Sequence, residues 1–307
     1  MVRVLCLLLL LGGCEWLVPL DGLAGGPRDG GTCRGDFTSD RLNCGSCGHS
    51  CLGGECVKSR CQPVTIAEDQ PGPLGIAVSA NHVFWVNQTP AGLVRAGKDG
   101  SAPKALASPT DQIEEPFDIA TDADETFVYW SELSKNQVFR KPINGGAKEA
   151  VGNGGPGQTA FLAVEGTQVY VSDYRPGFGS IANDQVLFRE MDTIAGLAVK
   201  GGVVYWALQT TSKIMVGPAT GGDGTGTVAV DAVVGRPMGV AVDQDNIYWI
   251  EDGQRIKQAP RRGGASPVLL YESPQAFGDS DIATDGAAIY WTEHGMGASG
   301  LVRKLAR

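Results

Sequence analysis

A repeated aromatic signature constrains the fold of this chain more than any other feature of its sequence. Six dipeptides carry it: Phe84-Trp85, Tyr129-Trp130, Tyr170-Val171, Tyr205-Trp206, Tyr248-Trp249 and Tyr290-Trp291. Their successive spacings are 45, 41, 35, 43 and 42 residues. An apolar run that begins the same unit precedes each dipeptide, as Gly239 to Val242 precedes Tyr248. A period of this length indicates one supersecondary unit per copy.

The copy at residues 237–272 shows most clearly what one unit contains. Its apolar run stops at a turn-forming cluster, residues 243–246, and a β-branched and aromatic segment follows at 247–251. Two further strand-like segments, 255–259 and 267–271, are separated by glycine turns. Four antiparallel strands in roughly forty residues cannot bury their own apolar faces, so the units must pack on one another. The sequence therefore predicts an all-β fold, a six-bladed β-propeller.

The two ends of the repeat region predict how the ring closes. The sixth copy stops at residues 301–307, after its third strand. Residues 62–68 resemble residues 266–272, the end of the fifth copy, and they precede the first copy. We therefore expect this N-terminal strand to complete the last blade and protect its edge. The predicted propeller domain is 62–307.

The N-terminus has the pattern of an export signal. Arg3 is followed by an apolar run of eight residues from Val4 to Leu11 and then by Gly12-Gly13-Cys14. The run is too short to span a bilayer, which needs about twenty residues. Leu11 to Cys14 resembles the lipobox of bacterial lipoproteins, which implies a signal peptide at 1–13, an acylated Cys14 and a cell-envelope location. Secretion without lipidation is the alternative. Residues 14–32 form the predicted flexible tether.

Six cysteines follow within 29 residues, and we predict that they form a small module at 33–61: Cys33, Cys44, Cys47, Cys51, Cys56 and Cys61. In an exported segment this density predicts three disulfides, with 15 possible connectivities. The alternative is a zinc site, since Cys44, Cys47 and His49 have acceptable ligand spacing. The segment resembles small Cys-rich heads found before repeat domains in secreted proteins of myxobacterial type.

The Y-W-[TSI]-E segments, taken with expected third strands such as Val138-Phe139-Arg140 and Leu187-Phe188-Arg189, resemble the YWTD repeats of the low-density-lipoprotein-receptor type. That resemblance covers 62–307 and implies six blades. The chain departs from it by placing Glu or Asn where the family usually has Asp. Because Glu132 precedes Arg140 by eight residues, as Asn87 precedes Arg95, the acidic position is predicted to pair with the third-strand arginine. The alternative is a ring of ligands on one face.

By resemblance to other propellers, the loops before each first strand and after each second strand share one face with the channel mouth. Asp118 and Asp281 replace glycine at the start of the first strand in blades two and six, and residues 175–184 are an apparent insertion. The candidate ligand face comprises seven residues: Asp118, Asp281, Asp173, Arg175, Phe178, Glu293 and His294. Asp118 and Asp281 are also candidates for calcium or another divalent cation, with solvated loop residues as the alternative interpretation. Otherwise no cofactor is predicted.

Composition narrows the function classes. A net charge of −9 argues against nucleic-acid binding, which needs a basic surface. The chain has three histidines and none of the short hydrolase or phosphate-binding motifs. We therefore expect a monomeric binding or scaffold module for a protein or glycan ligand, held at the membrane through its lipid alone. The alternative is a metal-dependent hydrolase or lyase that uses Asp118, Asp281, Glu293 and His294.

Overall fold

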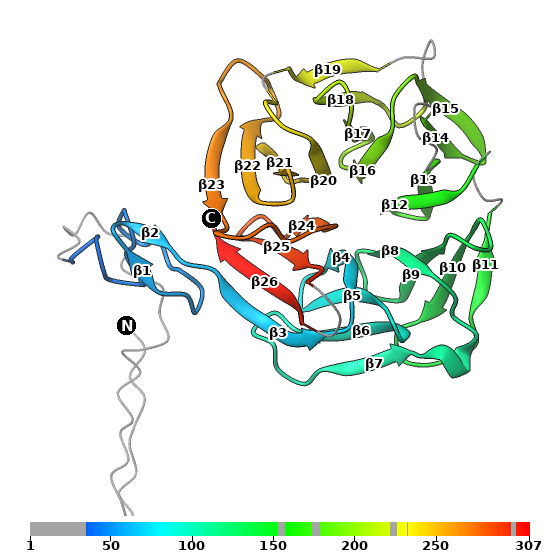
Figure 1. The fold of residues 1–307 in the computed structure, drawn as a ribbon, viewed down its shortest axis with the longest axis horizontal. Helices are drawn as coiled ribbons and strands as arrows, with labels where there is room; N and C mark the ends of the chain where they lie inside the picture. Colours follow the sequence, from blue (N-terminus) through cyan, green and yellow to red (C-terminus); the bar gives the residue numbers. More distant parts are fainter. Residues whose placement is uncertain (1–34, 153–156, 174–178, 222–225, 232, 296–298) are drawn as a thin grey trace, which may run out of the picture.

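The computed structural model describes residues 35–307, except 153–156, 174–178, 222–225, 232 and 296–298. Six four-stranded antiparallel sheets surround a common axis in this part of the chain (Figure 1). The first strands of neighbouring sheets contact one another all the way around the axis. The six-bladed propeller predicted from the repeat is therefore confirmed.

The blades have the following strands. Blade one contains β4 (Pro73–Val78), β5 (His82–Gln88), β6 (Ala91–Gly97) and β7 (Lys104–Ala107). Blade two contains β8 (Pro116–Thr121), β9 (Phe127–Glu132), β10 (Gln137–Pro142) and β11 (Glu149–Val151). Blade three contains β12 (Thr159–Glu165), β13 (Gln168–Asp173), β14 (Gly179–Asn183) and β15 (Gln185–Glu190).

The second half of the ring repeats the arrangement. Blade four contains β16 (Ile194–Val199), β17 (Val203–Leu208), β18 (Lys213–Pro218) and β19 (Thr227–Val230). Blade five contains β20 (Pro237–Val242), β21 (Asn246–Glu251), β22 (Arg255–Pro260) and β23 (Val268–Glu272). Blade six contains β24 (Ile282–Thr284), β25 (Ala288–Glu293), β26 (Gly300–Ala306) and β3 (Val64–Gln70).

The aromatic signature lies on the second strand of each blade, where both faces are covered. In β21, residues 247–250 are all fully buried, because each sheet packs between two neighbours. The core accordingly lies between blades: Val86 of blade one and Trp130 of blade two belong to one cluster. Burial of both faces explains why the runs are continuously apolar instead of alternating.

The ring closes as the sequence predicts. In blade six the order is β24, β25, β26, β3, so the outermost strand comes from the N-terminal end of the domain (Figure 1). Val302 pairs with Ala67 and Arg303 with Thr65. Ile66 is 8% exposed and packs in one cluster with Trp85 of blade one and Tyr290 of blade six. The closing strand thus contributes side chains to the core as well as backbone pairing.

Blade three differs from the sequence-based assignment. Residues 187–189 were expected in its third strand, but they lie in β15, the fourth. The third strand is β14, which lies within the segment predicted to be an insertion. Its residues Gly179 to Asn183 are mostly small and lack the aromatic and β-branched composition of the other strands. Asp184, at φ 56°, turns the chain directly into β15.

The predicted pairing between acidic and arginine positions is right in blade six and wrong in blade two. Glu293 lies 3.3 Å from Arg303, but Glu132 pairs with Lys135 and Lys148, at 2.8 and 3.1 Å. Arg140 instead binds Glu149. The reason is register: in the β9–β10 hairpin, Arg140 lies opposite residue 129, three positions along the strand from Glu132. At about 3.3 Å per residue, that offset is too long for a contact.

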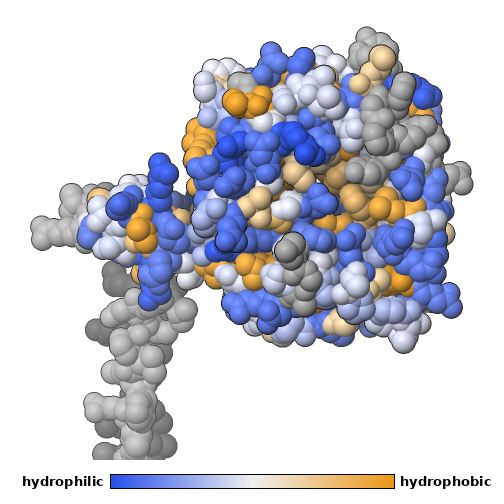
Figure 2. All heavy atoms as spheres, in the orientation of Figure 1, coloured by the Kyte–Doolittle hydropathy of each residue, from blue (hydrophilic) through white to orange (hydrophobic). Residues whose placement is uncertain are grey.

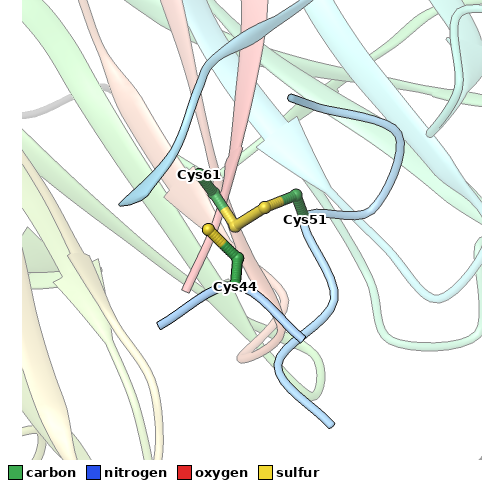
Figure 3. A group of neighbouring side chains, drawn as sticks. All are labelled: Cys44, Cys51 and Cys61. Carbon is green, nitrogen blue, oxygen red and sulfur yellow. A yellow bond between two sulfur atoms is a disulfide. The ribbon is translucent and has the colours of Figure 1, made fainter. Parts of the chain in front are cut away.

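The cysteine-rich module precedes the ring and has cystines at its centre. Disulfides join Cys44 to Cys56 and Cys51 to Cys61, which confirms disulfide bonding, and the sulfur atoms lie close together (Figure 3). Cys47 is also disulfide-bonded, whereas Cys33 lies outside the described residues. A bonded Cys44 is not the thiolate that zinc requires, so the zinc alternative is contradicted. The module's two strands are β1 (Cys56–Val57) and β2 (Arg60–Cys61).

Helical structure is minimal in the described residues. It consists of one short turn, η1 (Pro109–Asp111), and none of it is long and apolar enough to cross a membrane. Cys14, the predicted lipid anchor, lies outside the described residues.

Candidate ligand-binding site at the channel mouth

Two acidic residues from different blades meet on the propeller axis. Asp118 lies near the start of β8 in blade two, and Asp281 immediately precedes β24 in blade six. Blade one lies between them and places Gly75 at the equivalent position. A Cβ atom on Gly75 would lie 2.4 Å from the Cα of Asp118 and 2.5 Å from its Oδ1. The missing side chain of Gly75 therefore leaves the space in which the two carboxyl groups hydrogen-bond to each other.

Backbone N–H groups from other blades hold this pair in position. Asp118 accepts hydrogen bonds from the N–H of Ile119 and from that of Leu162 in blade three, both at 2.7 Å. Asp281 accepts one from the N–H of Ile76 in blade one, at 3.2 Å. The pair thus links first strands of four blades, which fixes the geometry of the channel.

The same local arrangement supports both acids. The N–H of Asp118 donates to Ser131 Oγ at 3.1 Å, and that hydroxyl donates to the carbonyl of Ala160 in blade three. Likewise, the N–H of Asp281 donates to Thr292 Oγ1 at 3.1 Å. The Thr292 hydroxyl donates in turn to the carbonyl of Leu74 in blade one, at 2.6 Å. An acid on the first strand is thus matched by a hydroxyl on the second strand, which bonds to the next blade.

Burial keeps a proton on this pair. Asp118 is 4% exposed, and its burial raises its pKa well above the ordinary value, with the charge of Asp281 raising it further. Burial also raises the pKa of the half-buried Asp281, to about 6. Two carboxylates in contact cannot both ionise easily, so the protonated Asp118 donates to Asp281. Near neutral pH the pair then carries about one negative charge.

A pocket of about 80 Å³ opens above the acids, and all six blades contribute to its wall. The wall consists of Leu74, Gly75, Phe117, Phe161, Ala195, Gln209, Met238, Asp279, Ser280 and Asp281. The rings of Phe117 and Phe161 meet edge to face with their centroids 5.2 Å apart. Apolar side chains appear among polar ones near the middle of the ring (Figure 2). The pocket therefore combines apolar side chains with a few polar ones, among them the carboxyl groups of Asp279 and Asp281.

Three of the other predicted ligand residues, Glu293, Asp173 and His294, do not join the acid pair. Glu293 accepts hydrogen bonds from Trp291 Nε1 of its own strand at 3.0 Å and from Arg303 of the neighbouring strand β26 at 3.3 Å. Asp173 is fully buried at the end of β13. The ring of His294 lies beside Gly72. Arg175 and Phe178 fall outside the described residues.

The geometry of the described residues provides few ligands for a cation. In them, only one group of three or more His, Cys, Asp or Glu has its ligand atoms within 4.8 Å of one another, and it is the cysteine cluster of Figure 3. Asp118 and Asp281 thus have no third such ligand in this part of the chain. The divalent cation expected at these two residues stays a prediction.

Sequence reasoning missed the aromatic wall. The positions equivalent to Gly75 along the six copies read Gly, Asp, Phe, Gly, Gly and Asp. Phe161 therefore occupies, in blade three, the same axial position as the two acids. Phe117 and Met238 lie one residue earlier in their own copies. A comparison of this position and the one before it across the six copies would have identified the aromatic wall together with the two acids.

Comparisons with known proteins support the fold alone. No protein-family model and no curated protein matches the chain. One similar solved structure is a nidogen/laminin complex, with a TM-score of 0.59, 18% identity, and coverage of 70% of this chain and 86% of that one. Another is a luciferin-regenerating enzyme, with a TM-score of 0.63, 12% identity, and coverage of 80% of this chain and 96% of that one. A third is a PQQ-bound aldose sugar dehydrogenase from Streptomyces coelicolor, with a TM-score of 0.56, 13% identity, and coverage of 80% of this chain and 98% of that one.

Proposed function

We propose that this protein is an exported, lipid-anchored module of the cell envelope that binds a protein or glycan ligand at the channel mouth of its propeller. The observation that carries the proposal is the axial pocket, to which all six blades contribute and which combines apolar walls with a carboxylate. A concave, mostly apolar site with a few fixed polar groups is the usual form of a binding site.

The chemistry of the pocket favours binding over catalysis. Among the described residues, its wall contains no histidine, cysteine, lysine or arginine, and its acid pair is the one group that exchanges a proton near neutral pH. The two carboxyl groups are held by backbone N–H groups and by each other. Similar folds include both a complex between two proteins and enzymes, so the fold itself does not decide the function. The YWTD assignment remains part of this proposal, as a repeat type that fits the six blades.

Affinity capture from the envelope fraction tests the binding role. We expect the wild-type propeller to retain a ligand that a Phe117→Ala, Phe161→Ala variant loses, because both rings form the pocket wall. Arg262→Ala is the matched control, since Arg262 is exposed in the turn between third and fourth strands, on the opposite face. Capture that is equal for all three proteins, or lost equally in the control, would contradict a ligand at the channel mouth.

The anchor has its own test. A lipoprotein with several acyl chains is held stably, whereas one chain holds a protein only marginally, at roughly 0.8 kcal/mol per buried CH₂. We therefore expect Cys14→Ser to move the protein from the membrane pellet to the soluble fraction. Cys6→Ser, in the apolar part of the signal, is the control and should leave the protein in the pellet. A Cys14→Ser protein that stays in the pellet would overturn the lipid anchor.

A further inference from the structure

The axial pocket has a pronounced imbalance of charge. Among the described residues, its wall contains two acidic residues, Asp279 at the exposed rim and Asp281 at the axis, and no basic residue. Asp118 lies against Asp281 and is bonded to it and to backbone N–H groups. Two other buried acids of the propeller have basic partners, since Glu132 contacts two lysines and Glu251 contacts Arg255 and Lys257, whereas buried Asp192 is bonded to threonine residues. The axial pair thus carries a negative charge for which the described part of the pocket wall supplies no basic partner.

The walls determine which cation complements that charge. Phe117 and Phe161 present aromatic surface beside Asp281, while Leu74 and Met238 complete an apolar lining. Aromatic rings attract organic ammonium groups through their quadrupole, and the apolar lining suits an alkyl chain. A calcium or magnesium ion instead requires six or more oxygen ligands, supplied by several carboxylates and carbonyls or by water. The axial carboxyl oxygens already accept backbone hydrogen bonds, which leaves few for a metal.

We propose that the axial pocket binds an alkylammonium group, with its cationic end against Asp281 and its alkyl chain between Phe117, Phe161 and Met238. This inference rests on the proposed binding function and specifies the chemistry that the pocket recognises. The group comes either from a free amine or from a lysine side chain of a protein ligand. Both sources offer the same ammonium on a short apolar chain, and the pocket volume of about 80 Å³ accommodates a group of this small size.

Proton exchange provides a signature of this mode of binding. A cation beside Asp281 favours the ionised form of that carboxyl group, so binding below its pKa releases the proton of Asp281, while Asp118 keeps the proton that it donates to Asp281. Affinity should therefore rise as the pH increases through the raised pKa of the pair, which is about 6 for Asp281. The other titratable residue that the described part of the pocket wall contains is Asp279, which is exposed.

The test is a calorimetric titration of the full mature protein with n-butylammonium chloride at pH 5 and pH 8, in buffers of different ionisation enthalpy. We expect saturable binding that is tighter at pH 8 than at pH 5 and that releases protons at pH 5 but few at pH 8. Asp281→Asn should weaken it by about tenfold or more, and Phe161→Ala by about threefold or more. Asp231→Asn is the control, because Asp231 lies in the loop before β20 and its side chain is 78% exposed. A melting curve of each variant verifies that it is folded.

Three further ligands decide the outcome. n-Butanol has a similar chain without charge. If it binds as tightly as butylammonium, the pocket does not recognise the ammonium group and the proposal is wrong. Calcium chloride that binds in place of butylammonium would also overturn the proposal in favour of a metal. A peptide with one internal lysine that binds as tightly as butylammonium identifies a protein source, whereas a peptide that fails identifies a free amine. If butylammonium does not bind but the Phe117→Ala, Phe161→Ala variant still loses capture from the envelope, the alkylammonium proposal is wrong. The proposed binding function is then still supported.

Discussion

Replacement of residues 63–67 by a Gly-Ser linker of the same length is expected to abolish cooperative folding of the whole propeller. These residues supply most of β3, the outer strand of blade six, and they pair with β26. They also bring Ile66 into the core that joins blades one and six, where its loss alone costs about 2–5 kcal/mol. Small domains are stable by about 5–15 kcal/mol in total, so loss of the side chain and the strand pairing together removes much of that margin.

Thermal unfolding followed by near-ultraviolet circular dichroism measures this effect, because the buried tryptophans report ring packing. Ile66→Asp should approach the effect of the linker, since it places an unpaired charge among Trp85, Tyr290 and Val302. Val268→Asp is the matched control: Val268 lies on β23, the outer strand of blade five, and is 51% exposed. If the linker variant melts at the wild-type temperature, β3 does not close the ring.

The sequence revealed the ring because the repeat is carried by residues whose burial is the same in every copy. Trp130, Trp206 and Trp249 are all fully buried on second strands, so their spacing directly reports the blade count. The closing strand was predictable for a similar reason, since the last copy ends one strand short. Blade three was misassigned because β14 has few residues of high β propensity, and its position comes from pairing with β13.

The candidate site was only partly predictable. Asp118 and Asp281 stood out because they replace glycine in a repeated position, and the structure does bring them together. Glu293 and His294 come shortly after Asp281 in the sequence, but they do not join the acid pair in the structure. Glu293 is bonded to Trp291 and Arg303 within its own blade. Which carboxylates meet on the axis depends on the neighbouring blade: Gly75 is small enough to let the acids of blades two and six approach. The contact among Gly75, Asp118 and Asp281 joins the first two blades to the last one, so no local sequence pattern indicates it.

Gly75→Ala should therefore be among the most damaging methyl additions in the propeller. The new Cβ would lie 2.4 Å from the Cα of Asp118 and 2.9 Å from the backbone nitrogen of Ile119. Both are backbone atoms that move only if a first strand shifts, so we expect a loss of about 3 kcal/mol or more. Gly92→Ala is the control, because its nearest neighbour would be a carbonyl oxygen 3.3 Å away, and it should cost much less. Urea unfolding measures both.

The same variant should alter the pH dependence of stability. The folded protein binds the shared proton more tightly than the unfolded chain, since burial raises the pKa of both acids. The contribution of the pair is therefore fully present below the ordinary aspartate pKa and is lost as the pH rises through the folded value, about 6 for Asp281. If the methyl group separates the acids, the decrease in unfolding free energy between pH 5 and pH 8 should be smaller in Gly75→Ala than in the wild type. An unchanged decrease, with stability close to that of Gly92→Ala, would show that Gly75 does not control the meeting of the two acids.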